Sequence, residues 1–173
     1  MALIPACALP QDTLLNSYLR AGAYADCYVT DIAGRVTHAE YVEAFYTTSV
    51  FRIERLLLKW FASRPSTDDE AKQLAAGSID RFAAWRVEDR APDQLLLADV
   101  TGRTRSWLMV APADAGGVAR TRLYFGSAVV PLKRAQPGPR SMGAGFHALL
   151  GFHRLYSRIL LRAARQRLAR RAA

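Results

Sequence analysis

The sequence predicts a single α+β domain in which antiparallel strands pack against a long C-terminal helix. Three observations lead to this class: an alternating segment near residue 25, four strand-length segments between residues 82 and 131, and an amphipathic segment from residue 146 almost to the end. The chain is 173 residues long, 51% hydrophobic and 23% charged, which suits one compact domain with an apolar core. We expect residues 24–170 to form that core and residues 1–23 to lead into it.

The first strand is expected at residues 25–32, where the sequence ADCYVTDI alternates between two sets of side chains. Thr37 and Glu40 then have capping-box spacing, in which a hydroxyl and a carboxylate each satisfy a free amide at a helix start. This spacing predicts a helix from about His38. Residues 67 and 70 repeat it before another short helix, which Gly77 would end.

Between these two helices, Ser49 is expected to cap a further helical segment. Its apolar residues would form one broad face: Ile53, Leu56, Leu57, Trp60 and Phe61. Two helices at an angle and one kinked helix both fit this stretch.

Four segments then have the length and residue composition of strands: FAAWRVEDR, DQLLLADV, RTRSWLMVAP and GVARTRLYFGSAVVP. The connections between them, APD, TG and ADAGG, are short and rich in turn-forming residues. Tight connections between successive strands predict an antiparallel meander, and Thr101–Gly102 is its best hairpin turn.

The segment from Gly151 to Ala173 contains seven arginines and no acidic residue. The rest of the chain carries 17 basic and 15 acidic side chains, so the net charge of +9 is concentrated here. At about 100° per residue, one sector of roughly 80° collects four arginines: Arg154, Arg158, Arg162 and Arg165. The opposite side collects an apolar stripe that we expect to lie on the sheet: Leu149, Phe152, Tyr156, Ile159, Leu160 and Ala163.

This order of elements resembles the helix-grip superfamily of START-like and polyketide-cyclase-like proteins (SRPBCC). The stretches AEYVEAFYTTSVFRIERLLL, WRVEDRAPDQLLLADVTGRTRSWLMV and TRLYFGSAVVP look like a small uncharacterised bacterial branch of it. The resemblance covers about residues 25–170 and implies a curved sheet that grips the C-terminal helix around a cavity. The predicted meander is a strand or two shorter than the usual grip, which indicates a smaller or more open sheet.

Metal and membrane classes find no support in the sequence. Cys7 and Cys27 are the only cysteines and fit no CxxC or zinc spacing, so we expect a reducing, cytoplasmic setting with no metal and no cofactor. His147 and His153 lie roughly 240° apart on a helix, so they do not share a face as metal ligands would. No segment approaches the roughly 18 continuous apolar residues of a membrane-spanning helix.

Alternate strand residues and the apolar face of the last helix would line the implied cavity. Strand parity allows one inward set, but a shift of one residue would invert every assignment. The predicted ligand-binding residues are Trp85, Leu97, Asp99, Arg105, Trp107, Tyr124, Phe152 and Tyr156. For Trp85 and Trp107, ordinary core packing is the alternative. We expect the domain to bind an apolar or amphipathic small molecule, a lipid or metabolite, between sheet and helix.

A second hypothesis is a cyclase-like or hydrolase-like enzyme that uses Asp99, Arg105 or His147 as polar cavity groups. Nothing in their spacing selects a reaction, so the test is whether at least two of them converge in one pocket. A buried Arg105 would need an acidic partner such as Asp99.

A third hypothesis is a peripheral membrane or partner-binding domain that uses the sector of Arg154, Arg158, Arg162 and Arg165 on an anionic surface. A solvated arginine face explains the same pattern. Nucleic acid is disfavoured, because no base-stacking aromatic residues interleave with these arginines and no RNA- or DNA-binding motif is present. Whether a homodimer covers exposed apolar surface stays open.

Overall fold

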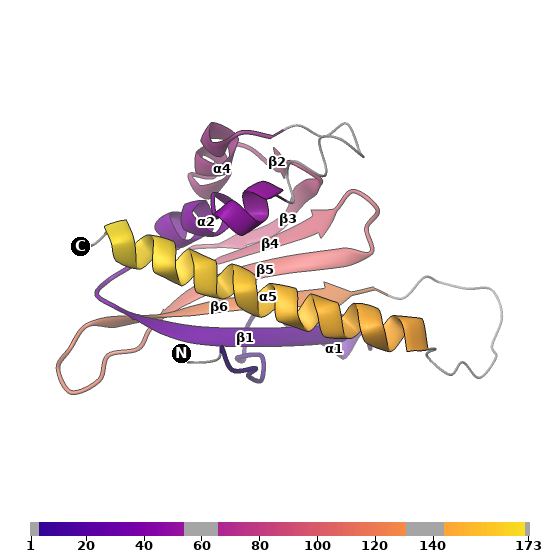
Figure 1. The fold of residues 1–173 in the computed structure, drawn as a ribbon, viewed down its shortest axis with the longest axis horizontal. Coiled ribbons are helices and arrows are strands. Elements are labelled where there is room, and N and C mark those ends of the chain that lie inside the picture. The colour runs from indigo at the N-terminus through magenta and orange to yellow at the C-terminus, as the bar shows by residue number, and fades with distance from the viewer. Residues whose placement is uncertain (1–3, 54–65, 131–143, 172–173) are drawn as a thin grey trace.

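Six antiparallel strands form one open sheet in the computed structural model of this chain (Figure 1). The structure describes residues 4–53, 66–130 and 144–171, and of residues 144–152 only the backbone. The strands are β1 (Tyr24–Ala33), β2 (Arg81–Phe82), β3 (Trp85–Ala91), β4 (Gln94–Asp99), β5 (Thr104–Pro112) and β6 (Arg120–Val129). The helices are α1 (Asn16–Arg20), α2 (His38–Tyr46), α4 (Asp68–Ala75) and α5 (Ala144–Arg171). The predicted α+β class is confirmed.

The sheet has the order β1-β6-β5-β4-β3-β2, so β3 to β6 form the predicted four-stranded meander and β1 is added beside β6. All ten residues of β1 pair with β6, from Tyr24 opposite Val129 to Ala33 opposite Arg120. The turn at Thr101–Gly102 joins β4 to β5 as predicted, and Gly102 adopts φ +70°, a conformation that glycine tolerates best. The short strand β2, which the sequence analysis did not anticipate, extends the sheet at its other edge.

Helices α2, α4 and α5 lie on one face of the sheet, called here the inner face (Figure 1). The larger core cluster fills the space between them and the strands, and its buried aromatic side chains are Tyr28, Tyr41, Phe45, Tyr46, Phe51, Phe82 and Phe125. The opposite, outer face carries a smaller cluster in which Leu15, just before α1, packs with Cys27, Leu96, Trp107 and Ala128. Both faces of the sheet are therefore covered in the part of the chain that the structure describes.

Both predicted capping boxes are present. Thr37 and Thr67 accept a hydrogen bond from the N3 amide of their helices, and the side chains of Glu40 and Glu70 accept one from the N-cap amide. The segment after α2 is helical over residues 49–53, but its cap is Thr48 and not Ser49, because Thr48 Oγ1 accepts from the Phe51 amide at 3.1 Å. Residues 56, 57, 60 and 61 of its expected apolar face lie outside the described residues.

The orientation of α5 differs from the prediction. Its described buried side chains are Ser157, Leu160, Leu161, Ala164 and Leu168, whereas Ile159 is 41% exposed. The expected apolar stripe is right for Leu160 and Tyr156, which pack against the inner cluster, and wrong for Ile159. The buried face is rotated because Tyr24, Tyr28 and Thr30 of β1 offer contacts to the arginine side of α5. Among the described helices, none combines the length and the apolar character needed to cross a membrane.

Candidate functional site

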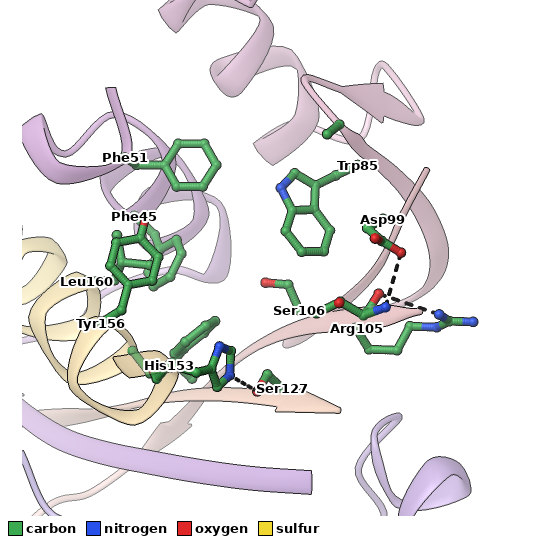
Figure 2. Close-up of a pocket in the computed structure, with 14 residues that line it drawn as sticks. Phe45, Phe51, Trp85, Asp99, Arg105, Ser106, Ser127, His153, Tyr156 and Leu160 are labelled. Carbon is green, nitrogen blue, oxygen red and sulfur yellow. Dashed lines mark hydrogen bonds between the residues drawn. The ribbon is translucent and has the colours of Figure 1, made fainter. Parts of the chain in front are cut away.

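A pocket of about 280 Å³ lies between the inner face of the sheet and helices α2 and α5 (Figure 2). Its apolar wall comes mainly from Phe45, Phe51, Phe125 and Leu160. Figure 2 shows Phe45, Phe51 and Leu160 on one side of the pocket. The polar side chains lie along the floor and the opposite side: Ser106, Ser127, His153 and Asp99. The arrangement is amphipathic, which suits a molecule with an apolar body and a polar group.

The polar floor results from strand register. Asp26 of β1 lies directly opposite Ser127 of β6, and Ser127 lies opposite Ser106 of β5, so three adjacent strands place polar side chains in one row. Helix α5 crosses this row and contributes His153. Ser127 Oγ is 2.6 Å from Asp26 Oδ1 and 2.6 Å from His153 Nε2.

The hydroxyl of Ser127 has a single proton, so it can donate only one of its two hydrogen bonds and must accept the other. An ionised Asp26 only accepts, so Ser127 donates to Asp26, and the Nε2–H of His153 then donates to Ser127 Oγ. His153 Nε2 is 3.8 Å from Asp26 Oδ2, so Ser127 is the bridge between them. In a nucleophilic triad the histidine lies between the acid and the serine, and the present order does not activate Ser127 as a nucleophile.

Hydrogen bonds from hydroxyl groups offset the cost of burying the Asp26 carboxylate. Its side chain is 9% exposed, and its second oxygen accepts from Tyr28 at 3.2 Å and from Tyr24 at 3.4 Å. Burial and the negative charge of Asp26 raise the pKa of Tyr28 well above its usual range, so this tyrosine remains a donor. Three hydroxyl groups thus stabilise one buried charge.

Trp85 brings a further polar group to the pocket wall, and this group has no partner among the described residues. The indole Nε1 of Trp85 is buried and has no hydrogen-bond partner among the described residues. Figure 2 shows this nitrogen on the side of the ring that faces Phe51. Nearby, Tyr46 and Ser106 share a hydrogen bond of 3.3 Å. The indole N–H is therefore a buried, unsatisfied donor in the pocket wall.

Asp99 lies on the rim of the pocket and serves the hairpin between β4 and β5. It accepts from Thr101 Oγ1 at 2.5 Å and from the amides of Arg103 and Thr104 at 2.8 and 3.1 Å. Burial opposes the charge of this carboxyl, but the three hydrogen bonds outweigh it and lower the pKa of Asp99. The hydrogen bonds of Asp99 therefore stabilise the turn first of all.

Arg105 does not pair with Asp99. Its side chain lies on the outer face, where Nε is 2.8 Å from Glu88 Oε2 and donates to Tyr18 Oη at 2.8 Å. The guanidinium also lies over the Tyr18 ring, 4.6 Å from the centroid. Asp99 and Arg105 both line the pocket but form no ion pair with each other, and the side chain of His147 lies outside the described residues.

The predicted strand phase is right for β3 and β4 and wrong for β5 and β6. Trp85 and Leu97 belong to the inner cluster, and Trp85 lines the pocket with Tyr156. Trp107 and Tyr124 instead belong to the outer cluster, where Trp107 Nε1 donates to Gln94 Oε1 at 2.9 Å. The N-terminal residues cover the outer face of β5 and β6, so both faces of these strands are apolar. The alternation of residues therefore could not show which face points into the pocket. The side chain of Phe152 lies outside the described residues.

Sequence reasoning missed Asp26 and Ser127 and considered His153 only for its spacing from His147. Polar residues on the inner face of largely apolar strands were the available signal. Their meaning depends on the pairing of β1 with β6, which joins residues 101 positions apart. Among the described residues, no group of three His, Cys, Asp or Glu side chains is placed to hold a metal ion.

Three of the four arginines expected on a basic surface pack against β1. Arg154 lies 5.9 Å from the centroid of Tyr24, and Arg158 lies 5.4 Å from that of Tyr28. Arg165 donates to Thr30 Oγ1 at 3.2 Å. Arg162 is half-buried. These arginines are therefore part of the contact between α5 and the sheet as well as of the surface.

The fold and the pocket define a class of protein: an α+β domain whose open antiparallel meander holds a hollow beneath a long C-terminal helix. No family model matches this chain, and no curated protein matches it. The function is therefore argued from the pocket itself.

Proposed function

We propose that this protein binds a small amphipathic molecule in the pocket between the sheet and α5. The observation that carries the proposal is that Trp85, which lines a pocket with an apolar wall, has a buried indole N–H with no partner among the described residues. A buried donor without a partner costs about 1–3 kcal/mol, and a ligand with a suitably placed oxygen would recover this cost. The ligand expected here has an apolar body and a hydrogen-bond acceptor.

The size of the pocket limits the ligand. Its volume of about 280 Å³ compares with roughly 150 Å³ for a cavity that holds one benzene molecule. A molecule of one or two rings, or a short branched chain, fits this space, whereas a whole long-chain lipid does not. The proposal therefore favours a metabolite over a membrane lipid. The helix-grip resemblance supports the same site, and we propose a distant relationship to that superfamily on the order of elements.

The proposal is tested with two probes that differ only in the acceptor: 2-acetylnaphthalene, which carries a carbonyl oxygen, and naphthalene, which does not. Isothermal titration calorimetry should detect binding of both, with the ketone bound more tightly. Trp85→Phe should weaken binding of the ketone by about tenfold and leave the affinity for naphthalene unchanged, because only the hydrogen bond is lost. Leu160→Trp, which fills the pocket, should abolish binding of both. Equal weakening of the two probes in Trp85→Phe would count against the assigned role of the indole.

A second candidate function is acid–base catalysis by His153. With Nε2–H donated to Ser127, the other ring nitrogen, Nδ1, carries the lone pair, and Figure 2 shows it pointing away from Ser127. A base in this position could remove a proton next to a carbonyl group of a bound ligand.

Proton NMR in D₂O tests this second function with the same ketone. The base would remove a methyl hydrogen of 2-acetylnaphthalene and a deuteron would replace it, so the methyl signal should decay faster with the protein than in buffer. His153→Gln should return the rate to the buffer value while calorimetry still detects binding. A wild-type exchange rate equal to the buffer rate would exclude the catalytic hypothesis and would not affect the binding proposal.

A further inference from the structure

The two cysteines of the chain meet on the outer face of the sheet. The Sγ atoms of Cys7 and Cys27 are 2.9 Å apart, although the residues are separated by 20 positions. Backbone hydrogen bonds hold the N-terminal segment beside β1: the Cys7 amide donates to the Cys27 carbonyl at 2.9 Å, and the Val29 amide donates to the Pro5 carbonyl at 3.2 Å. Two thiols are thus fixed side by side by the pairing of their backbones.

The two thiols differ in their surroundings. Cys27 is 2% exposed and packs with Trp107 in the outer cluster, whereas Cys7 is half-buried. The hydrogen bond between the two thiols lowers the pKa of Cys7, and the positive charge of Arg122 adds to this effect against the opposing effect of burial. The same hydrogen bond and burial raise the pKa of Cys27. Cys7 is therefore the more accessible thiol and the first to ionise.

We propose that Cys7 and Cys27 form a reversible disulfide that fastens the N-terminal segment to the edge of β1. A disulfide needs a sulfur–sulfur distance of about 2.05 Å, so the atoms must approach by less than about 1 Å. The backbone pairing already brings both residues to one place, and no rearrangement of the sheet is required. The bond would tie the segment that leads into α1 to the strand that carries Asp26 and Tyr28.

The reaction balances with a small-molecule disulfide as oxidant. The Cys7 thiolate attacks one sulfur of the oxidant, forms a mixed disulfide and releases one small thiolate. Cys27 then loses its proton, and its sulfur attacks Cys7 Sγ and releases the second small thiolate. Two protein thiols are oxidised to one disulfide, and one small disulfide is reduced to two thiols.

Oxidised glutathione is the probe for a first experiment on the full, folded chain. After reaction and alkylation of the remaining thiols, the intact mass should fall by two hydrogens, with no alkyl group added. Trypsin cleaves after Arg20 and Arg35, so the bond should appear as one cross-linked peptide made of residues 1–20 and 21–35. A persistent glutathione adduct on the wild-type protein, or two alkylated cysteines, would overturn the proposal.

Variants and stability complete the test. In Cys27→Ala, Cys7 should keep one glutathione, because no second thiol can displace it. Cys27 in the Cys7→Ser variant should be alkylated at least about tenfold more slowly than Cys7 in the Cys27→Ala variant, because Cys27 is buried. The oxidised wild type should melt about 5–10 °C above the reduced form, since the cross-link closes a loop of about 20 residues. An unchanged melting temperature would show that the bond does not fasten the segment.

Discussion

His153 Nε2 lies 2.6 Å from Ser127 Oγ, and this contact ties α5 to the sheet at the floor of the pocket. The same hydroxyl reaches Asp26 of the edge strand β1 at 2.6 Å. One serine therefore links a helix and two strands, and it does so at a position where a bound molecule would meet polar groups.

Ser127→Ala should destabilise the protein by about 1–3 kcal/mol, because one oxygen of the buried Asp26 and the ring nitrogen of His153 lose their shared partner. Urea unfolding at neutral pH measures the change. Ser78→Ala, at an exposed serine, is the matched control and should have little effect. A loss below about 0.5 kcal/mol in Ser127→Ala would mean that solvent already satisfies these groups.

Arg158→Ala should cost about 0.5–2 kcal/mol, because the guanidinium stacks over the buried ring of Tyr28 and the stem packs on β1. Arg170→Ala, at an exposed arginine of the same helix, should change the free energy of unfolding far less. Thermal and urea unfolding of the two variants give the comparison. Equal effects would identify the arginine side of α5 as an ordinary solvated surface.

Gly126→Ala should destabilise the protein by about 1–3 kcal/mol through overcrowding. A Cβ at this position would lie 2.9 Å from the Asp26 carbonyl oxygen, 2.9 Å from Trp107 Cε3 and 3.0 Å from Leu15 Cδ2. The first of these is backbone of the neighbouring strand and cannot move without disturbing the pairing of β1 and β6. Unfolding in urea checks the value, and a neutral result would show that the two strands separate easily here.

Asp99→Asn should remove a pH-dependent part of stability. Hydrogen bonds at the hairpin lower the pKa of Asp99 in the folded protein, so its stabilising contribution is present above the unfolded value of about 3.9 and is lost as pH falls through the folded value. The difference in unfolding free energy between wild type and variant should therefore be largest at pH 6–7 and shrink towards pH 2–3. A difference that is constant over this range would show that the charge contributes nothing.

Local signals in the sequence were sufficient for much of the fold. The capping boxes at Thr37 and Thr67 begin helices where they were predicted, since both depend on residues only three positions apart. The alternating segment at residues 25–32 and the turn at Gly102 are also present. The cap of the helical segment after α2 was placed one residue too late, because threonine and serine were adjacent and equally suited.

The faces of the strands could not be predicted in the same way. Trp107 and Tyr124 would suit the inner face as well as the outer one, and the outer cluster exists only because Leu15 and its neighbours fold back over β5 and β6. Arg105 likewise has its partner, Glu88, on that covered face. Coverage by a distant part of the chain determines which side of an apolar strand faces a pocket.

The sequence by itself determined the α+β class, the order of the main elements and the helix starts after Thr37 and Thr67, because these depend on periodicity and on contacts between residues close in the chain. Tertiary structure decided the pocket, the row of Asp26, Ser127 and His153, the rotation of α5 towards β1 and the meeting of Cys7 with Cys27. Each of these depends on the pairing of β1 or on the packing of α5 against it. Such contacts join residues 20 or more positions apart, and no local pattern encodes their register.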